Sequence, residues 1–260
     1  MPTILDEIIC WKRSEIERCT AALPAHAVQV EAAQASDPRD FAAALSQSGV
    51  SLIAEVKKAS PSKGLLRPHL DPVALAREYE ACGASAVSVL TDEHFFQGSL
   101  DHLRAVRRSI NLPVLCKDFV LDPYQVYRAR ASGADAILLI VAALSDGDLR
   151  SLYQLVRELG MAALVEVHNA VQLEQALRID PRIIGVNNRN LRTFEVNLET
   201  TARLRPLVAD SVILVAESGI KTRADVEWLA TIGADAILVG EVLVRAADVG
   251  YKVRELVGRP

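Results

Sequence analysis

Lysine and glutamate side chains lie at or near the ends of several short apolar segments of this 260-residue chain. Glu55 and Lys57 end the segment SLIAEVK. Lys117 ends PVLCK, and Glu166 lies within AALVEVH. An ammonium group beside a carboxylate shifts its pKa, and the two can then serve as general acid and general base. A single lysine at such a place is often only solvated, but four such groups together would favour proton-transfer catalysis.

The spacing within the first segment indicates which way its side chains point. Successive side chains of a strand alternate between its two faces, so Glu55 and Lys57 share a face and Lys58 takes the other. We therefore expect Glu55 and Lys57 to belong to one site. Lys58 is expected to be structural or solvated.

Three segments rich in glycine or serine indicate a phosphate site. AESGI at 216–220 and VGE at 239–241 follow late apolar segments, and SPSKG at 60–64 follows the first one. Backbone N–H groups in such turns bind phosphate in many barrel enzymes, although each turn alone is also explained as a simple tight turn. Together they predict a small phosphorylated ligand. A net charge of −4 without a long basic block argues against nucleic acid as the partner.

Three similar octapeptides indicate which elements position these groups. GASAVSVL, GADAILLI and GADAILVG begin at Gly83, Gly133 and Gly233, which are spaced by 50 and then 100 residues. Each octapeptide is typical of a glycine that ends a helix, followed by a strand buried on both faces. Half of the shorter spacing, about 25 residues, is the length of one strand-plus-helix unit.

Eight apolar segments recur near this period and predict a closed (β/α)8 TIM barrel of the α/β class. A doubly wound open sheet is the alternative, but the G-x-G-x-x-G motif that often follows its first strand is absent. Intervening segments at 71–82 and 122–133 each begin with Asp-Pro, a good helix start. The eight predicted strands are 51–57, 85–90, 112–118, 134–140, 162–168, 182–188, 212–218 and 234–240.

The C-terminal ends of barrel strands form one rim, where barrel enzymes hold their active sites. Phe96 and Phe119 near this rim either pack in the core or line a pocket for an aromatic ring. The five histidines lack the spacing of metal ligands, so no metal is expected. The polar residues at the strand ends are Glu55, Lys57, Thr91, Asp92, Glu93, Lys117, Asp118, Glu166, His168, Asn187, Asn188, Arg189, Glu217, Ser218 and, after Gly240, Glu241.

Residues 1–50 precede the eight units and are expected to form a helical extension that packs on a barrel of residues 51–260. Amphipathic helices are predicted at 4–19 and at 38–47. The four cysteines form no C-x-x-C pair, which favours reduced thiols and a cytoplasmic protein. No apolar run is long enough to span a membrane.

Seven segments, in their order and spacing, resemble the indole-3-glycerol-phosphate synthase family of tryptophan biosynthesis. They are AEVKKASPSKG, SVLTDEHFFQGSL, VLCKDFVLDPYQ, LVEVH, IGVNNRNL, AESGI and LVGEVLVRA, and the match extends over nearly the whole chain from about residue 3. The resemblance implies a carboxy-lyase that acts on 1-(o-carboxyphenylamino)-1-deoxyribulose 5-phosphate, closing a ring with loss of CO2 and water. It implies no cofactor and no metal. We expect a monomer, with weak association at most with other enzymes of the pathway.

The resemblance also implies roles for single residues. Lys117 resembles the general acid that protonates the ketone, and Glu166 resembles the carboxylate that stabilises positive charge or acts as base. Glu55 and Lys57 match the pair on the first strand, and either Lys57 or Lys117 supplies the acid for dehydration. Asn187 resembles a residue that orients the substrate. Phosphate binding is implied for Ser60, Ser218, Gly219, Gly240 and Glu241. Arg189 and Leu191 are implied at the pocket rim, and Phe96 and Phe119 as walls for the aromatic ring.

One departure from the family and two alternatives stay open. Asn190 stands in NNRNL where many relatives have aspartate, which puts in doubt an ion pair with Arg189. Another phosphosugar barrel enzyme, such as phosphoribosylanthranilate isomerase, would not need two lysines on the first and third strands. A non-catalytic barrel that binds phosphorylated metabolites would be expected to have lost an acid or a base.

Overall fold

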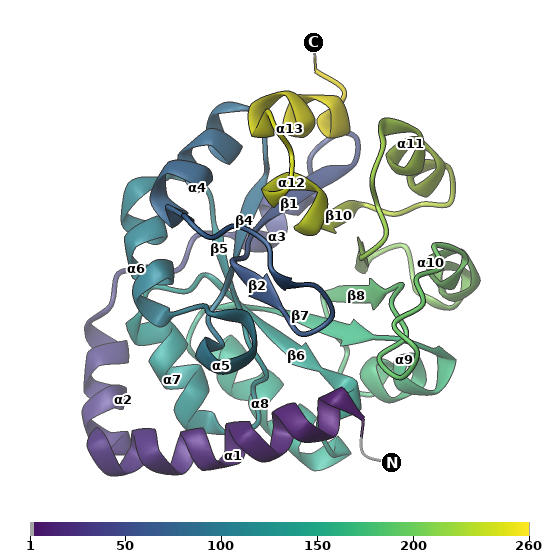
Figure 1. Cartoon of the computed structure of the whole chain (residues 1–260). Coiled ribbons are helices and arrows are strands. Elements are labelled where there is room, and N and C mark those ends of the chain that lie inside the picture. Colours follow the sequence, from purple (N-terminus) through teal and green to yellow (C-terminus); the bar gives the residue numbers. More distant parts are fainter. Residues whose placement is uncertain (1–2, 260) are drawn as a thin grey trace.

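The computed structural model describes residues 3–259 and contains a closed barrel of eight parallel strands (Figure 1). The order β1-β10-β9-β8-β7-β6-β5-β4 makes barrel strands that follow one another in sequence neighbours in space, which confirms the predicted TIM barrel. A short antiparallel pair, β2 (Ala59–Ser60) and β3 (Gly64–Leu65), follows the first barrel strand. The barrel strands are β1 (Ser51–Val56), β4 (Ala86–Leu90), β5 (Val114–Lys117), β6 (Ala136–Ile140), β7 (Ala162–Val167), β8 (Ile183–Asn187), β9 (Ile213–Glu217) and β10 (Ala236–Val239).

Helices surround the barrel, one long or medium helix after each strand. This outer ring consists of α4 (Pro72–Ala81), α6 (Leu100–Ser109), α7 (Pro123–Ala131), α8 (Asp146–Glu158), α9 (Ala170–Leu177), α10 (Glu199–Leu204), α11 (Arg223–Thr231) and α13 (Val249–Val257). Shorter helical turns lie in the loops at α5 (Glu93–Phe96), η1 (Val141–Ala143), η2 (Arg205–Leu207) and α12 (Glu241–Val244). Three helices precede the barrel: α1 (Ile4–Ala22), α2 (Ala25–Gln34) and α3 (Phe41–Leu45).

The helix starts follow the predicted cap chemistry. Asp71 accepts hydrogen bonds from two backbone N–H groups of α4, and Asp122 accepts one from a backbone N–H group of α7. Each aspartate is followed directly by a proline, a residue that suits the first turn of a helix. The repeat glycines Gly83, Gly133 and Gly233 have φ values of 101°, 87° and 86°. Because this left-handed conformation favours glycine, each repeat ends its helix and turns into the next strand.

The aspartate of the two GADAIL repeats has a structural function that explains why it recurs. Oδ2 of Asp135 accepts a hydrogen bond from Val114 N at 2.7 Å, and Oδ2 of Asp235 accepts one from Leu214 N at 2.8 Å. Each aspartate therefore ties the first residues of its strand to the preceding strand. Asp135 is fully buried and its Oδ1 also accepts from the backbone of Arg39, which joins the N-terminal segment to the barrel.

The core has two layers separated by the barrel wall. The larger layer lies between the strands and the outer helices, and the smaller one fills the barrel interior with side chains such as Ile53, Leu115 and Leu164. Phe41 and Leu45 of α3 pack into this inner cluster. Both side chains contact residues at the starts of barrel strands. Helix α3 therefore closes the N-terminal end of the barrel, and the C-terminal end stays available for a site.

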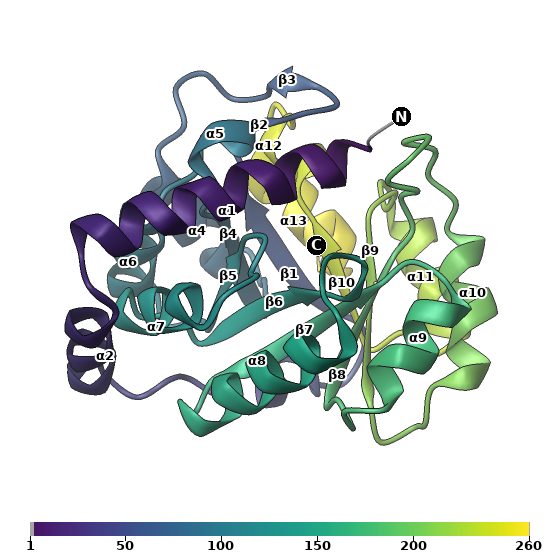
Figure 2. The same ribbon diagram turned by 90° about the horizontal axis from the view of Figure 1, so that it is seen from below.

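The N-terminal segment differs in part from the prediction. The helix predicted at 4–19 is confirmed as α1, which lies across the side of the barrel that carries the β2–β3 pair (Figure 2). The helix predicted at 38–47 is reduced to the five residues of α3, and α2 was missed. Helix α2 has no side-chain cap, which removes the usual signal for a helix start. The division into 1–50 and 51–260 stays a prediction. Within residues 3–259 no helix combines the length and apolarity needed to cross a membrane.

Asp135→Ala is expected to lower the free energy of unfolding by about 3 kcal/mol. The half-buried guanidinium of Arg107, whose Nε lies 3.0 Å from Oδ2, loses its carboxylate partner. The bonds to two backbone N–H groups are lost as well. Asp235→Ala is the matched control, since Asp235 is exposed and accepts one bond, and about 1 kcal/mol is expected there. Urea unfolding measures both, and equal losses would contradict this account of the repeat.

Candidate active site

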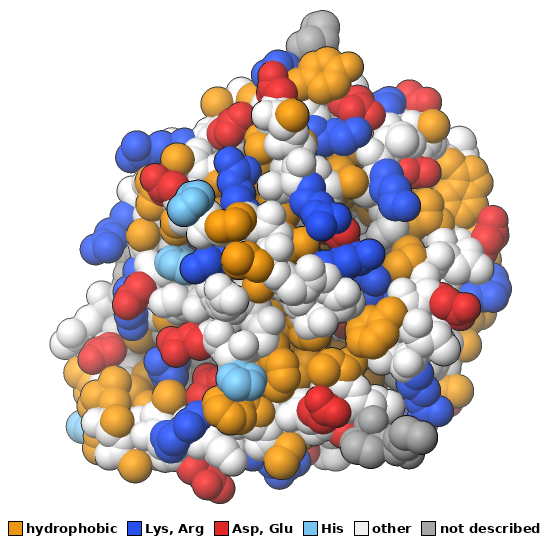
Figure 3. Space-filling view, in the orientation of Figure 1, with side chains coloured by type: hydrophobic (Ala, Val, Ile, Leu, Met, Phe, Trp, Pro, Cys, Tyr) orange, Lys and Arg blue, Asp and Glu red, His pale blue; other side chains and the backbone are white. Residues whose placement is uncertain are grey.

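A cavity of about 720 Å³ opens at the C-terminal ends of the barrel strands. In the space-filling view, Lys and Arg side chains gather around the centre of this face, beside apolar side chains (Figure 3). Every residue predicted for the site lines the cavity: Glu55, Lys57, Ser60, Phe96, Lys117, Phe119, Glu166, Asn187, Arg189, Leu191, Ser218, Gly219, Gly240 and Glu241. The fold thus brings together residues that lie up to 186 positions apart in the sequence.

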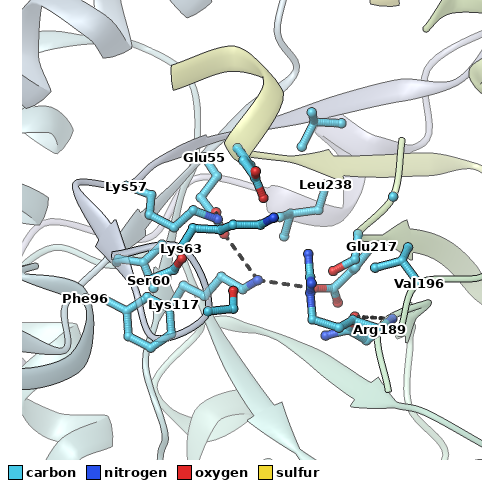
Figure 4. A pocket seen from close by; sticks show the side chains of 18 of the residues that line it. Glu55, Lys57, Ser60, Lys63, Phe96, Lys117, Arg189, Val196, Glu217 and Leu238 are labelled. Atoms are coloured by element: carbon cyan, nitrogen blue, oxygen red, sulfur yellow. Dashed lines mark hydrogen bonds and ion pairs between the residues drawn. The ribbon is translucent and has the colours of Figure 1, made fainter. Parts of the chain in front are cut away.

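The ammonium group of Lys117 lies between two carboxylates in this cavity (Figure 4). Its Nζ is 3.2 Å from Oε2 of Glu55 and 3.3 Å from Oε2 of Glu217. The three side chains come from β5, β1 and β9, whose ends meet because the barrel is closed. Burial alone would lower the pKa of Lys117, but the two carboxylates raise it above its ordinary value. Lys117 is therefore held as a cation.

Glu55 is the most strongly ionised carboxylate of the site. It is buried, and its Oε1 pairs with Nζ of Lys57 at 2.5 Å. Burial opposes ionisation, yet Lys57 and Lys117 together lower the pKa of Glu55 to about 2. A methyl group added at Gly240 would collide with the Glu55 carboxylate, so this glycine leaves room for the pair. Glu55 and Lys57 share the site as their spacing predicted.

Glu166 and Glu217 have the opposite electrostatic character. Burial raises the pKa of Glu217 to about 8, and it also raises the pKa of Glu166, where Lys117 and Asn187 oppose it only in part. A methyl group added at Gly185 would collide with the Glu217 carboxylate, so this glycine too leaves room for a functional side chain. Near neutral pH, this carboxylate pair therefore holds a proton that can be given to a ligand.

His168 lies behind Glu166 and is oriented by Gln172. Oε1 of Gln172 accepts the backbone N–H of His168 at 2.8 Å and lies 3.2 Å from its Nδ1. This network assigns the ring proton to Nδ1, since an acceptor oxygen faces it. Nε2 then presents a lone pair 3.3 Å from Oε1 of Glu166. Burial lowers the pKa of His168, which favours the neutral ring.

One side of the cavity is suited to an anion. Ser218 and Gly219 follow β9 with φ values of 64° and 88°, and a methyl group at Gly219 would collide with Val196. This left-handed turn is uncommon for serine and is the kind of strain found at ligand sites. Lys63 and Arg189 approach from the two sides of the pocket in Figure 4. Further cations lining the cavity are Lys221, Arg245 and Lys252.

Another part of the cavity is apolar. The rings of Phe96 and Phe119 lie 6.0 Å apart with an angle of 37° between their planes, and both line the cavity. Ile4, Leu5 and Ile8 of α1 line it as well, so the N-terminal helix forms part of its wall. Both phenylalanines thus line the pocket, and Phe119 also packs against the inner core cluster. A flat aromatic group is the ligand such a surface favours.

Two asparagines near the rim have structural functions. Asn188 is buried and joins β9 to α10, because its Nδ2 donates to the carbonyl of Glu217 at 3.0 Å and its Oδ1 accepts from Thr201 Oγ1 at 2.8 Å. Oδ1 of Asn190 accepts the backbone N–H of Arg192 at 2.8 Å, a turn that aspartate forms equally well. The guanidinium of Arg189 donates instead to a backbone carbonyl, that of Phe194, at 3.3 Å.

Sequence reasoning did not assign every residue of this cavity. Glu217 was recognised at a strand end but received no role, although it contacts Lys117 directly. The α1 side chains were missed, because an amphipathic pattern does not tell what the apolar face contacts. Across residues 3–259, no cluster of three or more His, Cys, Asp or Glu side chains is arranged to hold a metal ion.

The sequence matches known proteins over almost its full length. Residues 5–256 match the family model described as indole-3-glycerol phosphate synthase. The chain is 54% identical to the indole-3-glycerol phosphate synthase of Roseiflexus sp. (strain RS-1), with 99% of each chain covered. It is 51% identical to the enzyme of that name from Dehalococcoides mccartyi (strain 195), covering 97% of this chain and 99% of the relative.

Solved structures support the fold independently. The structure of 3-hexulose-6-phosphate synthase matches with a TM-score of 0.65 at 13% identity, covering 80% of this chain and 99% of that one. At this identity the likeness concerns the barrel alone. The full-length sequence matches go further, and by them this chain belongs to the indole-3-glycerol phosphate synthase family.

Proposed function

We propose that this protein converts 1-(o-carboxyphenylamino)-1-deoxyribulose 5-phosphate into indole-3-glycerol phosphate, as a carboxy-lyase that also removes water. The observation that carries the proposal is the half-buried Lys117 ammonium, shared by Glu55 and Glu217 in a cavity with an apolar and a cationic part. The substrate has the matching parts: an aromatic ring, a ketone and a phosphate.

Binding would orient the substrate across the cavity. The anthranilate ring lies against Phe96 and Phe119, where apolar surface is available. The phosphate binds at the glycine-rich turns after β9 and β10, contacting Ser218, Gly219 and the backbone of Gly240 and Glu241, with Ser60 from the first loop. Arg189 and Leu191 form the rim. Between the two ends the ketone faces Lys117, and Asn187 helps to orient the chain.

The first chemical step forms the new ring. The ring carbon that bears the carboxylate attacks the ketone carbon, and Lys117 protonates the ketone oxygen as the C–C bond forms. The positive charge left on the ring nitrogen is stabilised by nearby carboxylates, Glu166 among them. CO2 then leaves, and the electron pair of its C–C bond returns to the ring and neutralises that charge.

The second step removes water. The new hydroxyl group leaves after it gains a proton from an acid, and a base removes the remaining proton to complete the indole. Lys57 or Lys117 supplies the first proton, and Glu166 is the base we assign. Glu217, whose pKa is raised to about 8, is a further proton carrier beside Lys117. With Glu55 ionised, both lysines charged and one proton on the Glu166–Glu217 pair, these five groups together carry no net charge.

The alternatives are less well supported by this site. An isomerase of phosphoribosylanthranilate would need one acid and one base, whereas this cavity is lined by Lys57 and Lys117 together with Glu55, Glu166 and Glu217. A non-catalytic barrel would have no reason to retain buried ionisable groups at 3.2–3.3 Å from one another. The expected monomer, the weak association with pathway enzymes, the cytoplasmic location and the absence of a cofactor stay predictions.

The direct test of the proposed function is product formation. The purified protein is incubated with the carboxyphenylamino-deoxyribulose phosphate without added metal, and the increase of indole fluorescence is followed. Release of CO2 in equal amount to the indole product is expected. Folded protein that forms no indole product would refute the proposal.

Lys117→Met is expected to lower kcat by about 10³-fold, because general acids typically contribute 10² to 10⁴. The methionine retains the shape of the side chain but cannot donate a proton. Lys58→Met is the matched control, since Lys58 does not line the cavity, and near-normal turnover is expected. Near-normal turnover of Lys117→Met itself would transfer the acid role to Lys57.

Glu217→Gln is expected to change how stability depends on pH. The native state binds a proton at Glu217 up to about pH 8, while the unfolded chain loses it near pH 4.3, so the wild-type protein loses stability as pH rises through this window. A difference of one bound proton between the native and unfolded states changes the free energy of unfolding by at most about 1.4 kcal/mol per pH unit. Relative to Glu217→Gln, wild-type stability should therefore fall between pH 5 and 8 in urea unfolding. A stability difference that does not change with pH would contradict the raised pKa.

A further inference from the structure

A buried lysine in the N-terminal helix forms an ion cluster that the proposed reaction does not use. Lys12 of α1 is completely buried, with an exposed fraction of 0%. Its Nζ lies 2.8 Å from Oδ2 of Asp92, 2.8 Å from Oδ1 of Asp118 and 3.0 Å from Oε2 of Glu15. An ammonium group has three protons, and three carboxylates face this one.

This cluster is unusual for a helix that lies on the outside of a barrel. Lysine is almost never fully buried unless it is paired, because removing its charge from water is costly. Burial lowers the pKa of Lys12, but Asp118 and Asp92 raise it further, so the side chain stays charged. Asp92 and Asp118 come from the loops after β4 and β5, so the cluster fixes α1 to two neighbouring strand ends.

The same two aspartates shape the turns that carry the aromatic walls of the cavity. Oδ1 of Asp92 accepts the backbone N–H of Phe96 at 3.2 Å and caps the short helix that presents this ring. Oδ1 of Asp118 accepts the backbone N–H of Phe119 at 2.8 Å, and its Oδ2 accepts Thr91 Oγ1 at 2.6 Å. Lys12 therefore contacts the side chains that hold both phenylalanines.

The apolar face of α1 is positioned by the same contact. Ile8 lies one helical turn before Lys12, and Ile4 and Leu5 lie two turns before it, so all four residues lie toward one side of the helix. The three apolar residues line the cavity. One ion cluster thus connects every apolar wall named for the ring end: the two phenylalanines and helix α1.

We propose that Lys12 is a positioning residue that assembles the aromatic-ring subsite by joining α1 to the turns that carry Phe96 and Phe119. The inference rests on the proposed function for the identity of the ring. It assigns Lys12 no contact with substrate. Its effect should appear in substrate binding rather than in proton transfer, because the contacts of Lys117 with Glu55 and Glu217 do not include the cluster.

Trp11 provides a probe of this assembly that does not depend on catalysis. Its ring stacks on His94 of α5, with centroids 3.8 Å apart. Helix α5 also carries Phe96, so Trp11 reports whether α1 is docked on the aromatic wall. The chain has only one other tryptophan, Trp228, and a Trp228→Phe background isolates the Trp11 signal.

The test is Lys12→Met in the Trp228→Phe background, with Trp11 emission measured without substrate and KM and kcat measured for indole formation. We expect Trp11 emission to shift to longer wavelength and KM to rise about tenfold or more, with kcat within about threefold of the parent. Arg13→Met is the matched control, since Arg13 is exposed on the same helix, and neither quantity should change.

A second variant separates positioning from a general loss of stability. Lys12→Met with Asp92→Asn also removes the charge of the one fully buried carboxylate of the cluster, while the asparagine oxygen still caps α5. The same rise in KM is expected. A KM within twofold of the parent in a folded variant, a fall in kcat with unchanged KM, or unfolding of both variants would overturn the proposal. A parent protein that forms no indole product would refute the proposed function instead, while Trp11 emission would still test the docking of α1.

Discussion

The structure depends on one electrostatic constraint: an ammonium that is largely removed from water must have carboxylate partners, and the closed barrel supplies them from strands far apart in sequence. Lys117 on β5 meets Glu55 on β1 and Glu217 on β9 only because eight parallel strands end at one rim. An isolated charge at this depth would cost several kcal/mol, so the cation and its partners have to be placed together. Glycines at 185 and 240 leave the space that this placement requires.

This constraint produces carboxylates with opposite tendencies in one cavity. Glu55 pairs with two lysines and stays ionised, with its pKa lowered to about 2 despite burial, while burial raises the pKa of Glu217 to about 8. Groups whose environments separate their pKa values can divide the roles of acid, base and charge stabiliser. A ring closure followed by loss of CO2 and water requires each of these roles in turn. The anion-binding turns and apolar walls then determine which molecule reacts.

Much of this could be predicted from the sequence, because buried parallel strands, Asp-Pro caps and repeat glycines are local signals. These signals located the strand ends. All the predicted site residues lie at or near those ends, and the structure brings them together in one cavity. Helix α2 lacks a side-chain cap and was missed. Lys12 lies between Trp11 and Arg13 in a charged helix and gives no local sign that it is buried, since its two aspartate partners are 80 and 106 residues away. Its burial follows from tertiary packing, which periodicity does not describe.

Carboxyl ¹³C NMR titration of the free protein with labelled glutamate would show whether one rim holds carboxylates of opposite protonation. Glu55→Gln and Glu217→Gln variants assign the resonances. We expect the Glu55 carboxyl to stay ionised down to about pH 2 and the Glu217 carboxyl to titrate near pH 8. Titration of both near pH 4 would contradict it.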